Sequence, residues 1–164
     1  MTLVFVENRY ILKFVMARRK TRTRGGREES AFLELVRTTD ILSRRVSQTL
    51  KKEELSPPQY NVLRIVRGEP AGLSCGEIGS RLIALDPDIT RLLDRLERRG
   101  LISRSRETRD RRTVVVRMTP DGLKLVGRLD GPVQAVHREQ LGHLGEKRLK
   151  ILSELLTACR DRLT

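Results

Sequence analysis

Aromatic residues are scarce in this sequence, and tryptophan is absent. Phe, Trp and Tyr together account for 3% of the chain. Proteins that bind single-stranded nucleic acid without sequence preference stack the bases on aromatic side chains. A composition this poor in aromatics therefore argues against a single-strand binder of the stacking type.

Cysteine and histidine are also rare. The two cysteines, Cys75 and Cys159, form no Cys-x-x-Cys pair, which argues against a disulfide scaffold and fits a reducing cytoplasm. The two histidines, His137 and His143, have no carboxylates around them in a pattern typical of a metal site. We therefore expect no metal, no cofactor and a cytoplasmic location.

Two functional classes find little support in the sequence. There is no P-loop and no glycine fingerprint of a dinucleotide-binding site, so we do not expect an enzyme.

Residues 1–16 are apolar, but Glu7, Arg9 and Lys13 interrupt them, which makes the stretch too short and too charged to cross a bilayer. It also lacks the basic start and the cleavage site of a signal peptide. We expect no membrane partner.

Positive charge is what the sequence has in excess. Lys and Arg number 34 against 21 Asp and Glu, which gives a formal net charge of +13 and a pI near 10.9. Such a balance points to a polyanionic partner, either nucleic acid or an anionic membrane surface. The charge by itself identifies the class of partner and not the partner.

Residues 1–27 are expected to form a basic, disordered arm. The basic run in residues 17–27 is either a solvated tail or an arm that follows a DNA backbone. Residues 1–15 have two interpretations. They form a poorly specified strand or helix outside the domain, or translation truly starts at Met16 and they are not part of the protein. The remainder, residues 28–164, is long enough for one domain with a substantial core.

The first half of that domain carries signals for helices. Apolar residues at helical spacing predict a long helix over residues 28–54. Ser56 and Pro57 predict the start of a second helix, because serine caps a helix and proline suits its first position. Ser74 and Glu77 match a capping box that opens a short third helix, whose apolar residues are Ile78, Leu82 and Ile83.

A further amphipathic helix follows after a brief turn. Asp86 is its expected cap and Pro87 its first residue, and Gly100 ends it. An apolar stripe at positions i, i+3, i+4 and i+7 is predicted to face the core, and consists of Ile89, Leu92, Leu93 and Leu96. A short capped helix, a tight turn and an amphipathic helix together predict a helix-turn-helix.

A basic hairpin is expected next. One strand begins at Leu101, and β-branched residues predict a second strand over residues 113–118. The connection between the two strands is crowded with arginine: Arg104, Arg106, Arg109, Arg111 and Arg112. The hairpin turns the helix-turn-helix into a winged one with a two-stranded wing, and we expect the DNA-binding lobe to cover about residues 56–118.

The last part of the chain is again helical, over about residues 120–163. Its final helix, from about Gly145, carries an apolar seam at alternating spacings of three and four, formed by Leu149, Leu152, Leu156, Cys159 and Leu163. Either the protein's own first helix or a second copy of the chain covers such a seam. We expect a second copy to contribute, because a winged helix that reads duplex DNA gains register from a two-fold partner.

These elements, in this order, resemble the MarR family of bacterial transcriptional regulators. The resemblance covers about residues 30–163. Its most specific part is the run LLDRLERRGLISRSRETRDRRTVVVRMTPDG, in which Asp110-Arg111-Arg112 precede a valine-rich strand and then Met118-Thr119-Pro120-Asp121-Gly122. It implies a mainly α, winged-helix homodimer, with a helical dimerisation lobe built from about residues 28–54 and 120–163.

The resemblance also implies roles for individual residues. Arg112 matches the wing arginine at the minor groove, Asp110 matches the acid that braces the wing, and residues 88–95 match the recognition helix. The expected dimer contacts are Phe32, Leu35, Leu149, Leu152, Leu156 and Leu163. Members of the family bind a pseudo-palindromic operator, usually as repressors that a small ligand or an oxidant releases.

Side-chain chemistry supports a DNA interface. An arginine in a narrow minor groove gains from the negative potential there, and Arg109 and Arg111 either share this role with Arg112 or contact phosphates. In the recognition helix, Thr90 and Arg91 are the candidates for base edges, and Arg95 for a phosphate. Thr90 is equally a candidate packing residue. Asp88 departs from many family members, and either meets cytosine amino groups or stays clear of DNA.

Effector chemistry is less well marked. Cys75 lies at a predicted helix start, where the helix dipole favours a thiolate, but a small packing residue is the simpler interpretation. A small organic anion is the ligand class that the family implies, and no residue identifies its pocket. The sequence thus predicts a cytoplasmic, nucleoid-associated regulator of transcription; the alternative is a basic module that binds RNA or ribosomes without operator specificity.

Overall fold

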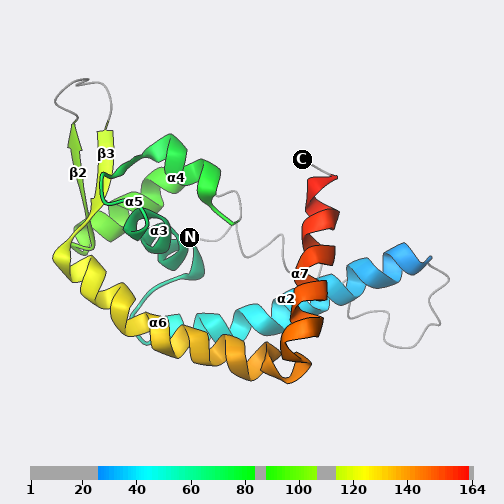
Figure 1. Cartoon of the computed structure of the whole chain (residues 1–164). Helices are drawn as coiled ribbons and strands as arrows, with labels where there is room; N and C mark the ends of the chain where they lie inside the picture. Colours follow the sequence, from blue (N-terminus) through cyan, green and yellow to red (C-terminus); the bar gives the residue numbers. More distant parts are fainter. Residues whose placement is uncertain (1–25, 84–87, 107–113, 163–164) are drawn as a thin grey trace. The chain divides into compact units, whose positions relative to one another are not determined.

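The computed structural model describes residues 26–83, 88–106 and 114–162. The chain divides into two compact units, residues 1–44 and 45–164. In chain order the elements are α2 (Arg27–Lys51), α3 (Pro57–Arg67), β1 (Leu73–Ser74), α4 (Cys75–Arg81), α5 (Ile89–Arg98), β2 (Ile102–Arg106), β3 (Val114–Met118), α6 (Pro120–Leu141), the 3-10 helix η1 (Gly142–Leu144) and α7 (Gly145–Asp161) (Figure 1). The fold is mainly helical with a small antiparallel sheet, as predicted.

Local sequence signals set most of the helix starts. Ser56 caps α3 and Ser74 caps α4, each in a complete capping box, and Thr119 caps α6 ahead of Pro120. Each of these side chains accepts a backbone N–H that the first helical turn leaves without a partner. Among the described residues, no helix has the length and apolar character needed to span a membrane.

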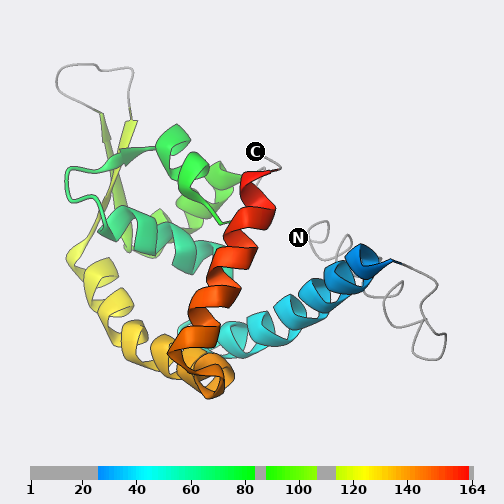
Figure 2. The same ribbon diagram turned by 45° about the vertical axis from the view of Figure 1, so that its right-hand side comes forward.

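The sheet has three strands in the order β1-β3-β2. Its hairpin pairs Ile102 with Met118 and Arg106 with Val114, close to the predicted strand ends. The third strand, β1, places Leu73 opposite Val116 and was not predicted. Two residues are too few for a period-two pattern to stand out in a sequence, and Ser74 already carried a helix-capping signal. In both views the hairpin lies beside α3 and α5 (Figures 1 and 2).

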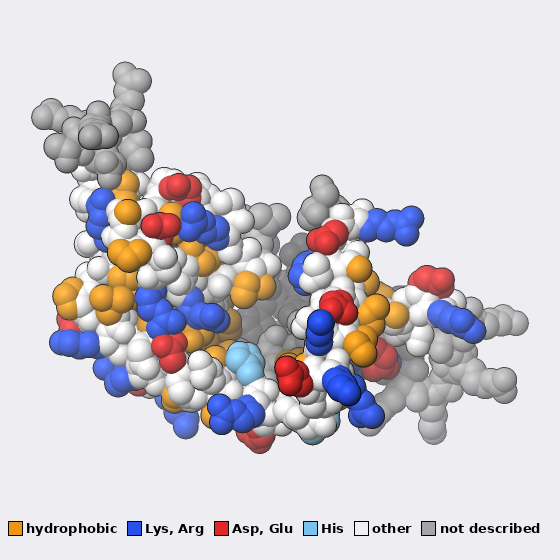
Figure 3. Space-filling model, viewed as in Figure 1, with side chains coloured by type: hydrophobic (Ala, Val, Ile, Leu, Met, Phe, Trp, Pro, Cys, Tyr) orange, Lys and Arg blue, Asp and Glu red, His pale blue; other side chains and the backbone are white. Residues whose placement is uncertain are grey.

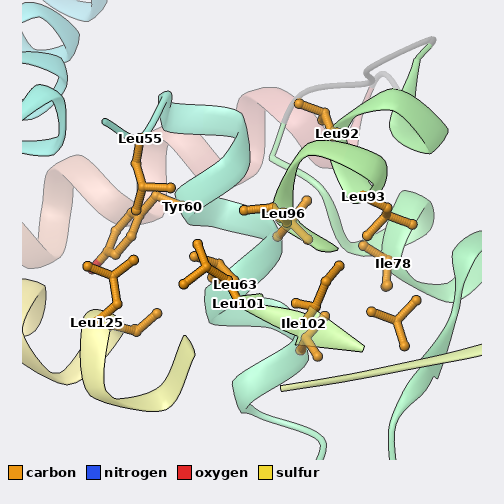
Figure 4. Close-up of a cluster of buried hydrophobic side chains, with 14 of the residues drawn as sticks. Leu55, Tyr60, Leu63, Ile78, Leu92, Leu93, Leu96, Leu101, Ile102 and Leu125 are labelled. Carbon is orange, nitrogen blue, oxygen red and sulfur yellow. The ribbon is translucent and has the colours of Figure 1, made fainter. Parts of the chain in front are cut away.

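One apolar core joins α3, α4, α5, the sheet and the first half of α6. From α5, Leu92, Leu93 and Leu96 are at most 7% exposed, and Ile89 packs against the same cluster, so the predicted stripe is confirmed. In Figure 4, Leu96 lies close to Leu63 of α3 and Ile102 of β2, and Leu93 lies close to Ile78 of α4. Full burial of each such side chain contributes about 1.5–3 kcal/mol, and this anchors α5.

One predicted apolar position after α4 is not buried. Ile83 is 88% exposed, because α4 ends at Arg81 and the chain is already extended at Leu82. Helical spacing was extended past the end of this helix, where the side chains no longer share one face.

Two glycines meet backbone requirements around the hairpin. Gly100 ends α5 with a φ of +66°, a conformation that side chains disfavour, so the predicted stop is confirmed. Gly122 lies in the first turn of α6, where a Cβ would stand 2.0 Å from the carbonyl oxygen of Leu101. The glycine therefore allows α6 to approach the chain just before β2.

Replacing Gly122 tests this close approach. Gly122→Ala should destabilise the protein by about 1–3 kcal/mol, because the new methyl group displaces a backbone carbonyl and not a flexible side chain. The measurement is the midpoint of urea unfolding. Gly127→Ala in the same helix is the control: a Cβ there meets no atom within 4 Å, and alanine is the better helix former. Equal shifts for the two variants would contradict the packing argument.

Candidate nucleic-acid interface

The exposed side of α5 is polar and basic. Thr90, Arg91 and Arg95 are exposed, whereas the leucines on the opposite side are buried. Exposure of Thr90 disfavours the alternative that it is a packing residue. Three residues that the sequence predicted to contact DNA thus lie together on one rigidly anchored surface.

Asp88 stands at the N-terminus of this helix. Its carboxylate accepts a hydrogen bond from the backbone N–H of Arg91 at 3.4 Å, and its Oδ2 lies 3.0 Å from Nε of Arg91. In the structure α5 begins at Ile89, three residues after the predicted cap Asp86; Asp86 and Pro87 lie outside the described residues. Asp88 therefore caps the helix and limits the conformations of Arg91.

Helix α4 precedes α5, and its capping box is well formed. Glu77 accepts hydrogen bonds from the hydroxyl of Ser74 at 2.7 Å and from its backbone N–H at 2.8 Å, which lowers the pKa of the Glu77 carboxyl. Residues 72–76 match the letters Gly-x-Ser-x-Gly of a hydrolase nucleophile motif. The Ser74 hydroxyl is engaged in capping, so the match carries no sign of a nucleophile.

An ion-pair cluster joins α5 to the hairpin. The Arg104 guanidinium of β2 contacts the carboxylates of Asp94 and Glu97 on α5, with Nε 3.2 Å from Glu97, and the backbone N–H of Arg104 donates to Glu97 at 3.1 Å. The Arg104 side chain is 23% exposed. We call Asp94, Glu97 and Arg104 the Arg104 cluster. It joins strand β2 at the base of the hairpin to helix α5.

Sequence reasoning had not separated Arg104 from the other wing arginines. A signal was present, since Asp94 and Glu97 are three residues apart on one side of the helix that precedes Arg104. The bracing role was predicted for Asp110 instead. That residue and the predicted contacts Arg109, Arg111 and Arg112 lie outside the described residues.

A second polar contact holds the far end of α5. Arg99 donates hydrogen bonds to the carbonyl oxygens of Glu54 at 2.7 Å and Glu53 at 3.0 Å, which ties the helix to the turn between α2 and α3. A cavity of about 350 Å³ opens beside this contact, and its lining consists of Glu54, Gln59, Arg95, Arg98 and Arg99. Arg95 thus lies in a surface hollow of net positive charge.

The predicted dimer contacts lie in both units of the chain. In the first unit Phe32 is 57% and Leu35 is 40% exposed. In α7, Leu149, Leu152 and Leu156 are half-buried, and hydrophobic side chains line part of the helix (Figure 3). Leu163 lies outside the described residues. All of the described members keep apolar surface in the single chain.

The most exposed large apolar residues of α7 were not on the predicted list. Ile151 is 55% and Leu155 is 61% exposed. Cys159, a member of the predicted seam, is also exposed in the single chain. The heptad pattern identified one seam, and α7 contributes no residue to the buried apolar cluster.

The remaining polar candidates give no sign of a reactive site. Cys75 is half-buried and packs against the core, in agreement with its interpretation as a packing residue. His137 and His143 are exposed. Within residues 26–83, 88–106 and 114–162, no group of three His, Cys, Asp or Glu side chains could hold a metal ion.

The Arg104 cluster should be required for stability. Arg104→Gln leaves the carboxylates of Asp94 and Glu97 without their cation, and the loss should be about 1–3 kcal/mol in urea unfolding. Arg106→Gln, on the same strand but exposed, removes the same charge and should stay within about 0.5 kcal/mol of the wild type. A similar loss in both variants would assign the effect to net charge and not to the cluster.

Comparisons with known proteins agree with this geometry. The sequence profile described as the MarR family matches residues 55–114, which hold the helix-turn-helix and the first part of the wing. The chain is 40% identical over 114 residues to the HTH-type transcriptional regulator TtmR of Methylorubrum extorquens. That match covers 70% of this chain and 57% of TtmR, so the chain spans little more than half of that relative.

Two solved structures extend the comparison to the whole fold. The PcaV transcriptional regulator of Streptomyces coelicolor, crystallised with its natural ligand, is 28% identical with a TM-score of 0.66, over 77% of this chain and 91% of PcaV. A MarR transcription factor from Planctomyces limnophilus is 40% identical with a TM-score of 0.63, over 84% of this chain and 99% of that protein. These matches, to regulators and not to enzymes, show that the chain belongs to the MarR family of transcriptional regulators.

Proposed function

We propose that this protein is a homodimeric, DNA-binding repressor of transcription that recognises a pseudo-palindromic operator. The exposed side of α5 is the main support for this function, because Thr90, Arg91 and Arg95 lie there opposite a buried leucine stripe. A helix anchored in this way can enter the major groove without losing its packing. The formal net charge of +13 favours a polyanion as the partner.

Arg91 is the first candidate for base readout. Arginine commonly donates two hydrogen bonds to O6 and N7 of guanine. The nearby Asp88 carboxylate, 3.0 Å from Nε of Arg91, would hold the guanidinium in an extended position for such a contact. Asp88 itself then acts by positioning Arg91, or accepts a hydrogen bond from a cytosine amino group. Arg95, further along α5, would contact a phosphate.

The wing supplies the second contact. We assign Arg112 to the minor groove, with Arg109 and Arg111 at the groove or at phosphates and Asp110 as a brace. The support is the family resemblance and the basic composition of the connection between β2 and β3. The Arg104 cluster contributes by holding the hairpin base against α5, so that both elements meet the duplex in one fixed relation.

A second copy of the chain would cover the apolar residues of the terminal helices. Phe32 and Leu35 of α2, and Leu149, Leu152, Leu156 and Leu163 of the C-terminal segment, are the proposed contacts, with Ile151 and Leu155 added from their exposure. A two-fold dimer presents two copies of α5 about one helical turn of DNA apart, roughly 34 Å. Pseudo-palindromic recognition follows from that symmetry.

Release by a small organic anion completes the proposal. PcaV, the related regulator from Streptomyces, binds a natural ligand, which supports a ligand-responsive role here. A repressor of this kind acts in the cytoplasm and associates with the nucleoid while it is bound to DNA. Binding of the ligand would shift the dimer toward a form with lower operator affinity.

Footprinting on the gene's own upstream region tests this function. We expect a two-fold, sequence-selective footprint and a dimer in sedimentation at micromolar concentration. If each dimer neutralises roughly 6–10 phosphates, affinity should fall by about 10³–10⁵ between about 50 and 200 mM salt. Preferential binding to RNA, without selectivity for a duplex, would instead support an RNA- or ribosome-associated module.

Arg91→Ala tests base readout within that footprint. Operator affinity should fall by about 1–3 kcal/mol, and discrimination at one base pair should be lost, because the guanine contact is removed. Binding to operators substituted at each position gives the measurement. Arg37→Ala on α2 removes the same charge from another surface helix and should leave the pattern of discrimination intact. An unchanged pattern in the Arg91 variant would exclude this residue from base readout.

A further inference from the structure

Helix α6 is joined to the preceding helices by ion pairs as well as by apolar contacts. Its residues Arg128, Asp130 and Glu139 pair with Glu53, Arg67 and Arg45, respectively. The partners come from α3, from the end of α2 and from the turn between these two helices. These contacts are long-range in sequence, and nothing in the proposed DNA interface uses them.

The pair between Arg67 and Asp130 has the most restrictive geometry. Nη1 of Arg67 donates to Oδ2 of Asp130 at 2.7 Å, and Nη2 donates to Oδ1 at 3.1 Å. Two parallel hydrogen bonds fix the relative orientation of the groups as well as their distance. The bonds from Arg67 lower the pKa of the Asp130 carboxyl, and the carboxylate raises the pKa of Arg67.

This pair stands where α6 leaves the core. The buried residues of α6 end at Val133, three residues after Asp130, and the helix continues to Leu141 before η1 and α7 follow. Both views show α6 extending past the helices of the DNA-binding lobe (Figures 1 and 2). The eight residues beyond Val133 make about 12 Å of helix, so a tilt of about 10° moves the far end by about 2 Å.

Apolar contacts alone constrain this tilt poorly. Leucine and valine side chains pack without strict directional preference, whereas a bidentate arginine–carboxylate pair has a defined plane. The pairs Arg128–Glu53, at 3.3 Å, and Arg45–Glu139 are more exposed, and exposed pairs contribute little. Lys124–Asp121 links residues within α6 and cannot affect its tilt.

We propose that Arg67 and Asp130 are positioning residues that set the angle between the DNA-binding lobe and the outer half of α6. In a dimer held together through the terminal helices, this angle determines the distance between the two recognition helices. The pair thereby selects the half-site spacing that the protein accepts. The inference rests on the proposed function, since it concerns how a DNA-binding dimer measures its operator.

The test uses the full-length protein and a set of duplexes. The operator found by footprinting is varied so that its half-sites move together or apart by one or two base pairs, and affinities are measured by fluorescence anisotropy. The wild-type protein should bind a duplex of one half-site spacing most tightly. In the Asp130→Asn variant, the ratio of the affinity for that spacing to the affinity for neighbouring spacings should fall by about 3- to 30-fold, because loss of the bidentate pair allows α6 to tilt.

A matched variant separates positioning from stability. Asp121→Asn makes the same chemical change in the same helix, at an exposed residue whose ion partner is local, and should leave the spacing preference unchanged. The charge-swapped double variant, Arg67→Asp with Asp130→Arg, should restore part of the preference. If Asp130→Asn is unfolded, Arg67→Lys replaces it, because lysine keeps the charge and lacks the planar fork.

The outcomes distinguish the two proposals. A wild-type protein without a two-fold, selective footprint overturns the proposed function, and this inference with it. A selective wild type whose Asp130→Asn variant keeps the same ratio of affinities across spacings overturns the positioning role alone. An equal loss of affinity at every spacing would also overturn the positioning role, because it would show that the pair contributes to stability and not to the choice of spacing.

Discussion

The structure depends on burial of the leucine stripe of α5 against α3 and the sheet. Leu93 and Leu96 are at most 1% exposed, and they meet Leu63 and Ile102 in the core. Because this packing holds one side of α5, the other side is free to carry cations without a folding role. The +13 charge of the chain can then serve recognition, although clustered positive charge opposes compaction. A helix less firmly anchored could not present arginine at a fixed depth to a duplex.

Polar contacts orient what the apolar core anchors. The Arg104 cluster fixes β2 to α5, Asp88 restrains Arg91, and the Arg67–Asp130 pair holds α6 where it leaves the lobe. Each of these contacts has an ionised donor and acceptor, whose hydrogen bonds are directional and stronger than neutral ones. The core supplies most of the stability. The Arg104 cluster and the Arg67–Asp130 pair each join two elements, whereas Asp88 and Arg91 lie three residues apart at the start of one helix. In the proposed function, the orientation of the joined elements is part of the recognition of a duplex.

Local signals predicted much of this architecture. Ser56, Ser74 and Thr119 begin helices because their side chains bond to backbone groups three residues away, and Gly100 ends α5 because it tolerates a positive φ. Interactions over so few residues depend on the local sequence and not on the rest of the fold. The same reasoning failed at Ile83, which lies beyond the end of α4, where periodicity no longer tells which side faces the core. The buried stripe of α5 was predicted correctly because Leu92, Leu93 and Leu96 recur at regular spacing within one helix.

The sequence alone thus determined most of the helices, the caps of α3 and α4, the basic hairpin and the family, since each depends on neighbouring residues or on a contiguous motif. The cap of α5 is Asp88 and not the predicted Asp86. Tertiary structure decided the rest. Only the fold placed Leu73 opposite Val116, brought Arg104 to Asp94 and Glu97, and brought Arg67 to Asp130. The physical reason is that these pairings join segments that are distant in the chain. Their partners are selected by which surfaces the core brings together, and no local pattern records that choice.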